Sequence, residues 1–526
     1  MLKVAPQDKE KLIDPLFRTR PSFWLAVFVL LAVIAWGVYH YARQLTLGLG
    51  ETGMDRPVYW GLYMVNFIFF IGISQAGTLI SAILRLTGAE WRRPITRVAE
   101  AITAVALTIG ALQIIIDMGR PDRLLFVIQH GRLQSPILWD VLSVTAYLLG
   151  SVAYLYLPMI PDLALVRDNM PEDAAVWQRL LYRTLAAGWR GNREQWRRLE
   201  KAVSIMAIII IPIAISLHTI TSWILATTVQ PGWHSSIFGP YFVVAAIFSG
   251  IGALFLAMTT IRWAFGLQSY ITQKQYFNLG LLFIVMAVVW GYFTYSEEIG
   301  VAAGQQSDEF PVLASKLWGE FALSFWAMIA LILVAFLILV IPLLLPKRTT
   351  QLALFQPRFA LVSTGAAALM AFWLYRPEII FTDVAAVDPI WRSAALTLLV
   401  IFAGVAVLAV LAWLKARPLV GIIIASCCVI VGVWLERWNI VVPTMTHPRL
   451  IEYTAYRPSI TEIALTAASV ALFMLLFLVF FKLFPAISIW EIAEGRVISE
   501  AQARIEIPAP APSETLRRLG RWGQRE

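Results

Sequence analysis

The 526-residue chain is 59% hydrophobic and only 14% charged, and its mean hydropathy is +0.72. Soluble domains carry about a quarter charged residues, so this composition excludes a soluble protein and indicates an integral membrane protein. The net charge of +9 requires no nucleic-acid partner, because basic loops facing the anionic lipid of an inner leaflet account for it.

Twelve apolar runs are long enough to cross about 30 Å of hydrocarbon, which takes roughly 20 helical residues. They lie at 22–42, 58–84, 98–116, 137–157, 202–229, 240–261, 277–296, 321–345, 359–375, 393–414, 419–435 and 463–481. The run at 359–375 is short and holds Ser363 and Thr364, so a re-entrant or interfacial segment is an alternative there. Residues 1–21 are polar and do not have the pattern of a cleavable signal peptide. The sequence predicts an all-α polytopic membrane protein.

Basic residues are distributed unequally between alternate loops. Of the 42 Lys and Arg residues, 31 fall on the side that holds both termini and 11 on the other side. Because basic loops stay on the cytoplasmic side, both termini are predicted to be cytoplasmic. With these boundaries, no basic residue is expected in mid-span.

A stretch of carboxylates, arginines and a histidine between two strongly apolar spans lies on the predicted outer side. It contains Asp117, Arg120, Asp122, Arg123, His130, Ser135, Trp139 and Asp140. The first four of these could simply cap a helix and pair among themselves. Asp140 instead lies beyond the capping position of the next helix, where a carboxylate is costly if it is buried. The stretch is therefore a candidate site.

Other ionisable residues lie within or beside apolar spans. His218 is about midway along its span, and an intramembrane ionisable residue is a functional candidate, although a neutral histidine bonded to a neighbouring helix also fits. Glu297 and Glu298 are predicted to end one span, and Glu436 and Arg437 another. These groups could share a polar pocket, or they could pair only with one another and with lipid headgroups.

Several cofactor chemistries receive no support. The five histidines supply one clear mid-span imidazole, so a haem held between two helical histidines is not expected. Cys427 and Cys428 are adjacent within an apolar span, which favours core packing over iron–sulfur ligation or a disulfide framework. Phosphate-binding glycine motifs are missing from the sequence. We expect no metal site and no covalently or tightly bound redox cofactor, so any redox centre would belong to a partner.

Five ordered motifs resemble the NrfD/PsrC superfamily of quinone-reactive membrane subunits, and they look most like the ActC-type subunits of bacterial alternative complex III. They are Asp117-Met-Gly-Arg-Pro, Ser135-Pro-x-x-Trp-Asp140, Ser216-x-x-His-Thr, Pro231-Gly-Trp-His-Ser-x-x-Phe-Gly-Pro-Tyr241 and Glu436-Arg-Trp-x-Ile-Val-x-Pro443. The resemblance covers residues 20–480 approximately. It implies ten helices, built as two four-helix bundles with flanking helices, so the spans within 359–414 are an apparent inserted pair.

This plan divides the chain into seven parts. They are a cytoplasmic N-terminal segment (1–21), a peripheral first helix with an outer loop (22–57), a first four-helix bundle with the quinol site (58–229), a second bundle (240–358 and 419–445), an inserted hairpin (359–418), a last peripheral helix (460–484) and a cytoplasmic tail (485–526). The first part of the tail suits an interfacial amphipathic helix, and its proline run an extended linker.

The resemblance also implies a function. It indicates a membrane subunit of a quinol-oxidising respiratory or photosynthetic complex in the bacterial inner membrane, which binds menaquinol near the outer surface and passes electrons to an extrinsic iron–sulfur subunit. Haem c subunits and a second NrfD-like membrane subunit are further implied partners. Quinol oxidation needs a positioned base, and His130 and Asp140 are close enough along the chain to converge, so we predict them as quinol ligands and first proton acceptors. The surrounding polar network is predicted to contain Asp117, Arg120, Asp122, Arg123, Ser135, Trp139 and His234.

A proton path across the membrane is a second hypothesis, because chains of hydrogen-bonding groups mark proton relays in pumps. Its predicted members are Tyr63, Asn66, Gln75, Thr78, Gln113, His218, Tyr292, Tyr295, Glu297, Glu298, Glu436 and Arg437. Ordinary interhelical hydrogen bonds explain most of them equally well. The competing function classes are a non-catalytic anchor resembling ActF-type subunits and another quinone reductase subunit of the superfamily. A secondary transporter fits poorly, since the strong helix interruptions lie at span ends.

Overall fold

A computed structural model describes residues 5–228, 230–344, 365–366, 410 and 418–496. Every regular element among these residues is a helix, and ten of the helices are long and apolar enough to cross a membrane. The ten are α3 (Pro21–Leu47), α4 (Leu62–Leu86), α5 (Thr96–Asp117), α7 (Pro136–Asn169), α9 (Arg193–Ala226), α10 (Phe238–Ala264), α11 (Gln273–Gly304), α13 (Ala322–Leu344), α16 (Pro418–Thr446) and α17 (Ile460–Leu483). They confirm the all-α prediction and coincide with ten of the twelve predicted spans. The predicted spans 359–375 and 393–414 lie outside the described residues, apart from three positions.

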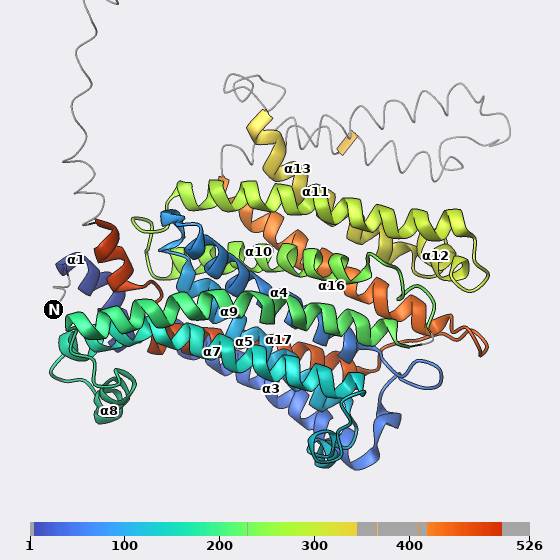
Figure 1. The fold of residues 1–526 in the computed structure, drawn as a ribbon, viewed down its shortest axis with the longest axis horizontal. Coiled ribbons are helices and arrows are strands. Elements are labelled where there is room, and N and C mark those ends of the chain that lie inside the picture. The colour runs from blue at the N-terminus through green and yellow to red at the C-terminus, as the bar shows by residue number, and fades with distance from the viewer. Residues whose placement is uncertain (1–4, 229, 345–364, 367–409, 411–417, 497–526) are drawn as a thin grey trace, which may run out of the picture.

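The long helices lie side by side in two groups (Figure 1). Helices α4, α5, α7 and α9 pack together as a first bundle, and helices α10, α11, α13 and α16 as a second bundle. Helix α4 joins the bundles through contacts with α10 and α16, while α3 and α17 pair with each other on the outside of the first bundle. The two-bundle architecture implied by the family resemblance is therefore present.

Local sequence signals explain where several helices begin. Helix α7 starts with Pro136, whose fixed φ and missing N–H suit the first helical position. The Asn192 side chain accepts a hydrogen bond from the Gln195 backbone N–H at 2.8 Å and caps α9. Ser459 and Glu462 form a reciprocal capping box at the start of α17. These caps satisfy backbone donors that the hydrocarbon could not.

The closest helix contact involves Gly77 on α4. A Cβ atom at this position would lie 1.7 Å from the Ala99 carbonyl oxygen and 2.0 Å from Thr103 Oγ1, both on α5. Only glycine allows the two backbones to approach this closely, as small residues do between membrane helices.

Helices α11 and α16 are longer than predicted. Glu436 and Arg437 lie inside α16, which continues to Thr446, so the prediction that they end a span is wrong. Glu297 and Glu298 likewise lie inside α11, which runs to Gly304. Arg437 is 1% exposed, which also contradicts the expectation of no basic residue in mid-span. Hydropathy cannot anticipate this placement, because it depends on partners supplied by other helices.

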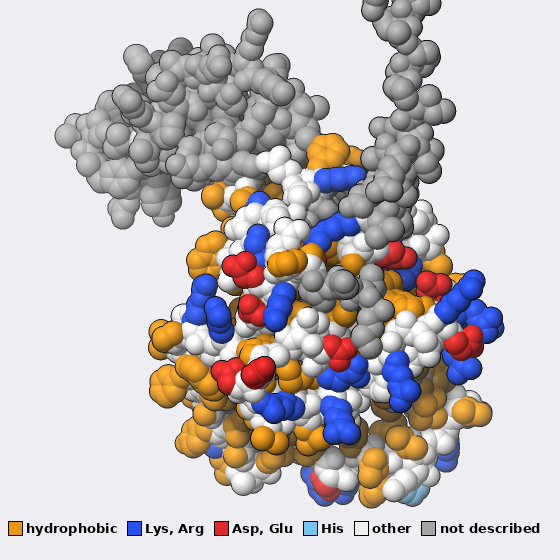
Figure 2. All heavy atoms as spheres, turned by 90° about the vertical axis from the view of Figure 1, so that its left-hand side faces the viewer, with side chains coloured by type: hydrophobic (Ala, Val, Ile, Leu, Met, Phe, Trp, Pro, Cys, Tyr) orange, Lys and Arg blue, Asp and Glu red, His pale blue; other side chains and the backbone are white. Residues whose placement is uncertain are grey.

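One end of the molecule, here called the basic end, gathers the N-terminal segment, α8 (Val176–Leu185) and a short helix at residues 489–496 (Figure 1). Figure 2 looks onto this end and shows Lys and Arg side chains scattered over it, with Asp and Glu among them. Helix α8 leaves Trp177 and Leu180 exposed, as expected of a helix at a membrane surface. The residues at 489–496, expected as an interfacial helix, instead pack into the protein, with Trp490 and Glu491 buried.

Candidate functional site

Asp140 lies near the start of α7, at the end of the first bundle opposite the basic end. Its Oδ1 accepts a hydrogen bond from Thr221 Oγ1 of α9 at 3.2 Å. The residue is half-buried. Among the described residues, the Thr221 hydroxyl is the one group with a hydrogen bond to its carboxylate. A carboxylate with a single neutral donor retains lone pairs for a ligand that carries an O–H.

The loop before α7 places His130 at the surface. His130 follows α6 (Phe126–Gln129), and its ring packs edge-on against Phe126 at a centroid distance of 5.4 Å. The Trp139 indole donates to the Leu133 carbonyl at 2.5 Å and folds the loop back onto α7. No hydrogen bond in the described part of the chain joins His130 to Asp140, so their convergence stays a prediction.

Apolar side chains surround this loop on the exposed side. Ile128, Leu133 and Ile137 are 62%, 78% and 61% exposed. In a membrane protein such exposed apolar residues face lipid or a partner.

The Asp-Met-Gly-Arg-Pro-Asp-Arg run does not form one network. Arg120 and Asp122 pair with each other on the surface at 3.1 Å, and the hydrogen bond from Arg120 holds the pKa of Asp122 below its usual range. Arg123 is also exposed, and Ser135 precedes α7 without a side-chain capping bond. Asp117 ends α5 with a buried Oδ1 that has no hydrogen-bond partner among the described residues. The structure therefore separates Asp117 from the exposed charges that follow it.

A buried carboxyl that sequence reasoning missed lies near Asp117. Glu462 is 0% exposed, and its Oε2 accepts hydrogen bonds from the backbone N–H groups of Gly53 at 2.6 Å and Ser459 at 2.9 Å. The Tyr456 hydroxyl donates to Oε1 of Glu462. Burial raises the pKa of the Tyr456 phenol and the Glu462 charge adds to this, so the phenol stays protonated. The Ser459-x-x-Glu462 capping-box pattern was a signal that could have found this residue.

A second polar group lies at the junction of the two bundles, among α4, α9, α10 and α16. Gln75 Nε2 on α4 lies 2.6 Å from His218 Nδ1 on α9, and His218 Nε2 is buried without a described partner. Arg437 lies over the Phe242 ring at 5.5 Å, and its Nη1 is 3.5 Å from Glu436 Oε2. The Trp290 indole donates to Glu436 Oε1 at 2.7 Å.

The other residues predicted for the proton path do not join the Gln75–His218 pair. Three first-bundle residues bond toward the peripheral pair α3 and α17: Tyr63 to Gln44 at 2.6 Å, Asn66 to Thr466 at 2.8 Å, and Gln113 to Ser469 at 2.7 Å. Tyr292 and Tyr295 are 65% and 64% exposed. The Thr78 side chain lies outside the described residues. Among the predicted first-bundle members whose side chains the structure describes, only Gln75 and His218 bond directly to each other.

The second bundle contains an open pocket at the end opposite the basic end, and its lining includes Glu297, Glu298, Glu309 and Lys316. Each of these three glutamates has a polar partner: Lys316 Nζ contacts Glu298 at 2.6 Å, Ser235 Oγ donates to Glu297 at 2.6 Å, and His234 Nε2 contacts Glu309 at 3.1 Å. His234 therefore pairs within the second bundle rather than with the Asp140 loop. In the described part of the chain, no cluster of His, Cys, Asp and Glu is placed to hold a metal ion.

The sequence profile described as "Polysulphide reductase, NrfD" matches residues 50–388, which is more than half of the chain. The chain belongs to the NrfD family. It is 33% identical over 239 residues to a putative membrane subunit of a dimethyl sulfoxide reductase from Halobacterium salinarum, covering 45% of this chain and 51% of that protein. The chain thus spans about half the length of this relative.

The names of two other relatives of this NrfD protein mention menaquinol or menaquinone. It is 23% identical over 331 residues to the Hdr-like menaquinol oxidoreductase integral membrane subunit of Archaeoglobus fulgidus, covering 62% of this chain and 72% of that protein. It is 30% identical over 139 residues to the menaquinone reductase, integral membrane subunit, of Nitratidesulfovibrio vulgaris, covering 26% of this chain and 32% of that protein.

Proposed function

We propose that this NrfD-family chain is the quinol-oxidising membrane subunit of an electron-transfer complex, with its quinol site at Asp140. The family membership and the two relatives named for menaquinol and menaquinone support menaquinol as the substrate. The electrons pass to an extrinsic iron–sulfur subunit on the same side of the membrane as Asp140. An ActC-type role within an alternative complex III is the finer form of this proposal.

The half-buried Asp140 carboxyl carries the proposal. It lies at a membrane-facing helix end beside exposed apolar residues, and Thr221 is its one described hydrogen-bond donor. A quinol hydroxyl could therefore donate to the free lone pairs of this carboxylate, which gives the reaction the positioned base that it needs. A fully paired carboxylate could not accept the proton as readily.

Oxidation of one quinol gives one quinone, two electrons and two protons. Asp140 accepts one proton, His130 binds the ring's other oxygen and accepts the second proton, and the extrinsic iron–sulfur subunit accepts both electrons. Ser135 and Trp139 hold the loop between them. Asp117, with its unpaired buried Oδ1, is a further acceptor on the route by which protons leave.

The test is quinol-driven reduction of the extrinsic subunit by the purified complex. Asp140→Asn and His130→Phe are each expected to abolish it while the complex still assembles. Asp122→Asn is the matched control, because Asp122 is an exposed carboxylate of the same loop that pairs with Arg120. Full activity in the Asp140→Asn variant would contradict the proposal. The chain would then have the role of a non-catalytic anchor.

The orientation belongs to the same proposal. Since basic loops stay inside, the basic end faces the cytoplasm and both termini lie there, in a bacterial inner membrane. The proposed complex also contains haem c subunits and a second NrfD-like membrane subunit. In whole cells, a cysteine introduced as Asp122→Cys should react with an impermeant maleimide, and one introduced as Arg190→Cys should not. The reverse pattern would contradict this orientation.

A second proposed activity is proton transfer through the first bundle. It is favoured by one observation: the Gln75–His218 pair lies one turn from Thr221, which itself bonds to Asp140. His218→Leu should lower the protons moved per quinol in vesicles that hold the complex. An unchanged proton yield removes His218 from any relay.

A further inference from the structure

A buried carboxyl, Glu100, lies near the start of α5 at the basic end of the first bundle. It is 2% exposed. Its Oε1 accepts a hydrogen bond from Ser81 Oγ of α4 at 2.8 Å, whereas Oε2 is buried and has no described hydrogen-bond partner. An orphaned buried acceptor is costly, and binding a proton converts that oxygen into a donor. Glu100 is thus equipped to exchange a proton.

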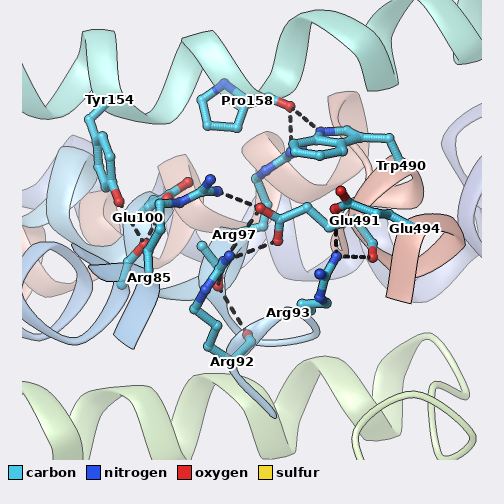
Figure 3. Close-up of polar contacts among 12 residues, drawn as sticks. Arg85, Arg92, Arg93, Arg97, Glu100, Tyr154, Pro158, Trp490, Glu491 and Glu494 are labelled. Carbon is cyan, nitrogen blue, oxygen red and sulfur yellow. Dashed lines mark hydrogen bonds and ion pairs between the residues drawn. The ribbon is translucent and has the colours of Figure 1, made fainter. Parts of the chain in front are cut away.

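Two neighbouring acids differ from Glu100, because arginine side chains contact them directly (Figure 3). Glu491 pairs with Arg85 and with Arg92, the latter at 3.2 Å. Asp162 pairs with Arg97 at 2.8 Å and accepts the Trp490 backbone N–H at 3.0 Å. Arginine side chains therefore contact both of these acids directly. The charges of Arg97 and Arg85 also act on Glu100, but neither arginine has a described hydrogen bond to its Oε2, which stays without a partner.

Hydroxyl groups lead from Glu100 toward the centre of the membrane. Ser81 Oγ lies 3.4 Å from the Tyr154 hydroxyl of α7. Two turns further along α4, the Ser74 carbonyl accepts hydrogen bonds from Thr103 at 2.7 Å and Tyr147 at 3.2 Å. Ser74 is followed by Gln75, the partner of His218. Ser74 and Ser81 are seven positions apart on α4, which is about 10 Å at the helical rise, a gap that water would have to bridge.

The C-terminal segment 484–496 covers this end of the bundle. Its Ile487, Ile489 and Trp490 are buried, and the Trp490 indole donates to the Pro158 carbonyl of α7 at 2.9 Å. Arg93 donates to the Glu491 carbonyl at 2.7 Å and pairs with Glu494 at 2.8 Å. Glu491 is the central anchor, because Arg85, Arg92 and Arg93 all bind it (Figure 3).

We infer that Glu100 is a proton-uptake site reached from the basic end. Segment 484–496 is the cap that separates Glu100 from water at this end. Glu491 is the latch, meaning the residue whose arginine contacts hold the cap in place. Water at the basic end delivers a proton to Glu100 Oε2, and the proton leaves toward Ser81 and Tyr154. No bond other than O–H forms or breaks. The inference rests on the proposed proton transfer through the first bundle.

The first experiment counts protons taken up from the basic-end compartment per quinol oxidised, with the complex in vesicles and a pH-sensitive dye. A change in the turnover rate alone leaves this ratio of protons to quinol unchanged. Glu100→Gln, which keeps the shape and the Ser81 contact but cannot carry the proton, should lower the ratio at least twofold. An unchanged ratio overturns the uptake site.

The second experiment needs no turnover, so its result is independent of whether the quinol proposal holds. Dicyclohexylcarbodiimide reacts with protonated carboxyls in apolar surroundings, and mass spectrometry of the α5 peptide reports modification of Glu100. Glu491→Gln should speed this labelling at least fivefold. Glu494→Gln is the matched control, because Glu494 contacts Arg93 from the exposed side, and it should label like the parent protein. If Glu491→Gln does not assemble, Arg92→Gln weakens the same latch, and equal labelling rates in the latch variant and the control overturn the cap.

Discussion

Replacing Arg97 by Met is predicted to destabilise the protein by about 3 to 5 kcal/mol, because it leaves a buried carboxylate without its charge partner. Arg97 and Asp162 have side chains that are 1% and 0% exposed, and their Nη2–Oδ2 distance is 2.8 Å. Solvent cannot replace the lost guanidinium at this depth. The Trp490 N–H would remain as a donor to the Asp162 carboxylate.

The double variant Arg97→Met/Asp162→Leu separates the ion pair from the rest of the site. Replacing a buried pair by apolar groups is close to neutral, so the remaining loss is the unpaired Trp490 N–H, at about 1 to 3 kcal/mol. Asp162→Leu alone leaves Arg97 buried without its partner as well, and should cost about 4 to 8 kcal/mol. The double variant should therefore be more stable than either single variant.

The free energy of unfolding can be measured in mixed micelles of dodecyl maltoside and increasing SDS, followed by tryptophan fluorescence. Strong non-additivity is the expected outcome, since the two residues share one interaction. A cost below about 1 kcal/mol for Arg97→Met would refute the assumption that this pair is desolvated, because that is the range of exposed pairs. A double variant at the sum of the two single costs would refute the coupling.

Three further changes test individual features of the fold. Gly77→Val should prevent folding, because even a Cβ atom would lie 1.7 Å from the Ala99 carbonyl oxygen; normal yield of monodisperse protein in detergent would contradict this contact. Asn192→Ala should cost about 1 kcal/mol by removing the cap of α9, measured by the same micelle unfolding, with no loss expected for Asn192→Asp. Burial would raise the pKa of Asp308, but the Arg449 hydrogen bond and charge hold it below its ordinary 3.8. Asp308→Asn should therefore lower stability slightly at pH 7, and this loss should shrink as the pH falls through the lowered pKa of Asp308 in the folded protein; a loss that does not change with pH would rule out the ion pair.

Much of the fold could be predicted from hydropathy. Ten apolar runs correspond to the ten spanning helices among the described residues, because crossing hydrocarbon imposes both a length and an apolar composition on each segment. Helix ends were less predictable where polar residues found partners. Glu436 and Arg437 looked like the end of a span, yet both lie buried inside α16, where the Trp290 indole donates to Glu436 and Arg437 lies beside the Glu436 carboxylate and over the Phe242 ring.

The candidate site was predictable in part. Asp140 was singled out by its position past a helix cap, and it lies at a bundle end with Thr221 as its donor. The sequence offered no means of separating Asp117 from Arg120 and Asp122, since all three are neighbours in the chain. Glu462 was missed because it comes from a helix that is remote in sequence, although its capping-box spacing was visible.

The sequence by itself determined that this chain is an α-helical membrane protein and where most of its spans lie, since the bilayer acts on each segment separately. Its motifs also indicated the family. Only the tertiary structure decided which polar residues meet, as in the pairing of Gln75 with His218 and of Glu491 with three arginines. Such contacts join residues that are tens to hundreds of positions apart, and they depend on helix rotation and close packing, which local composition does not encode.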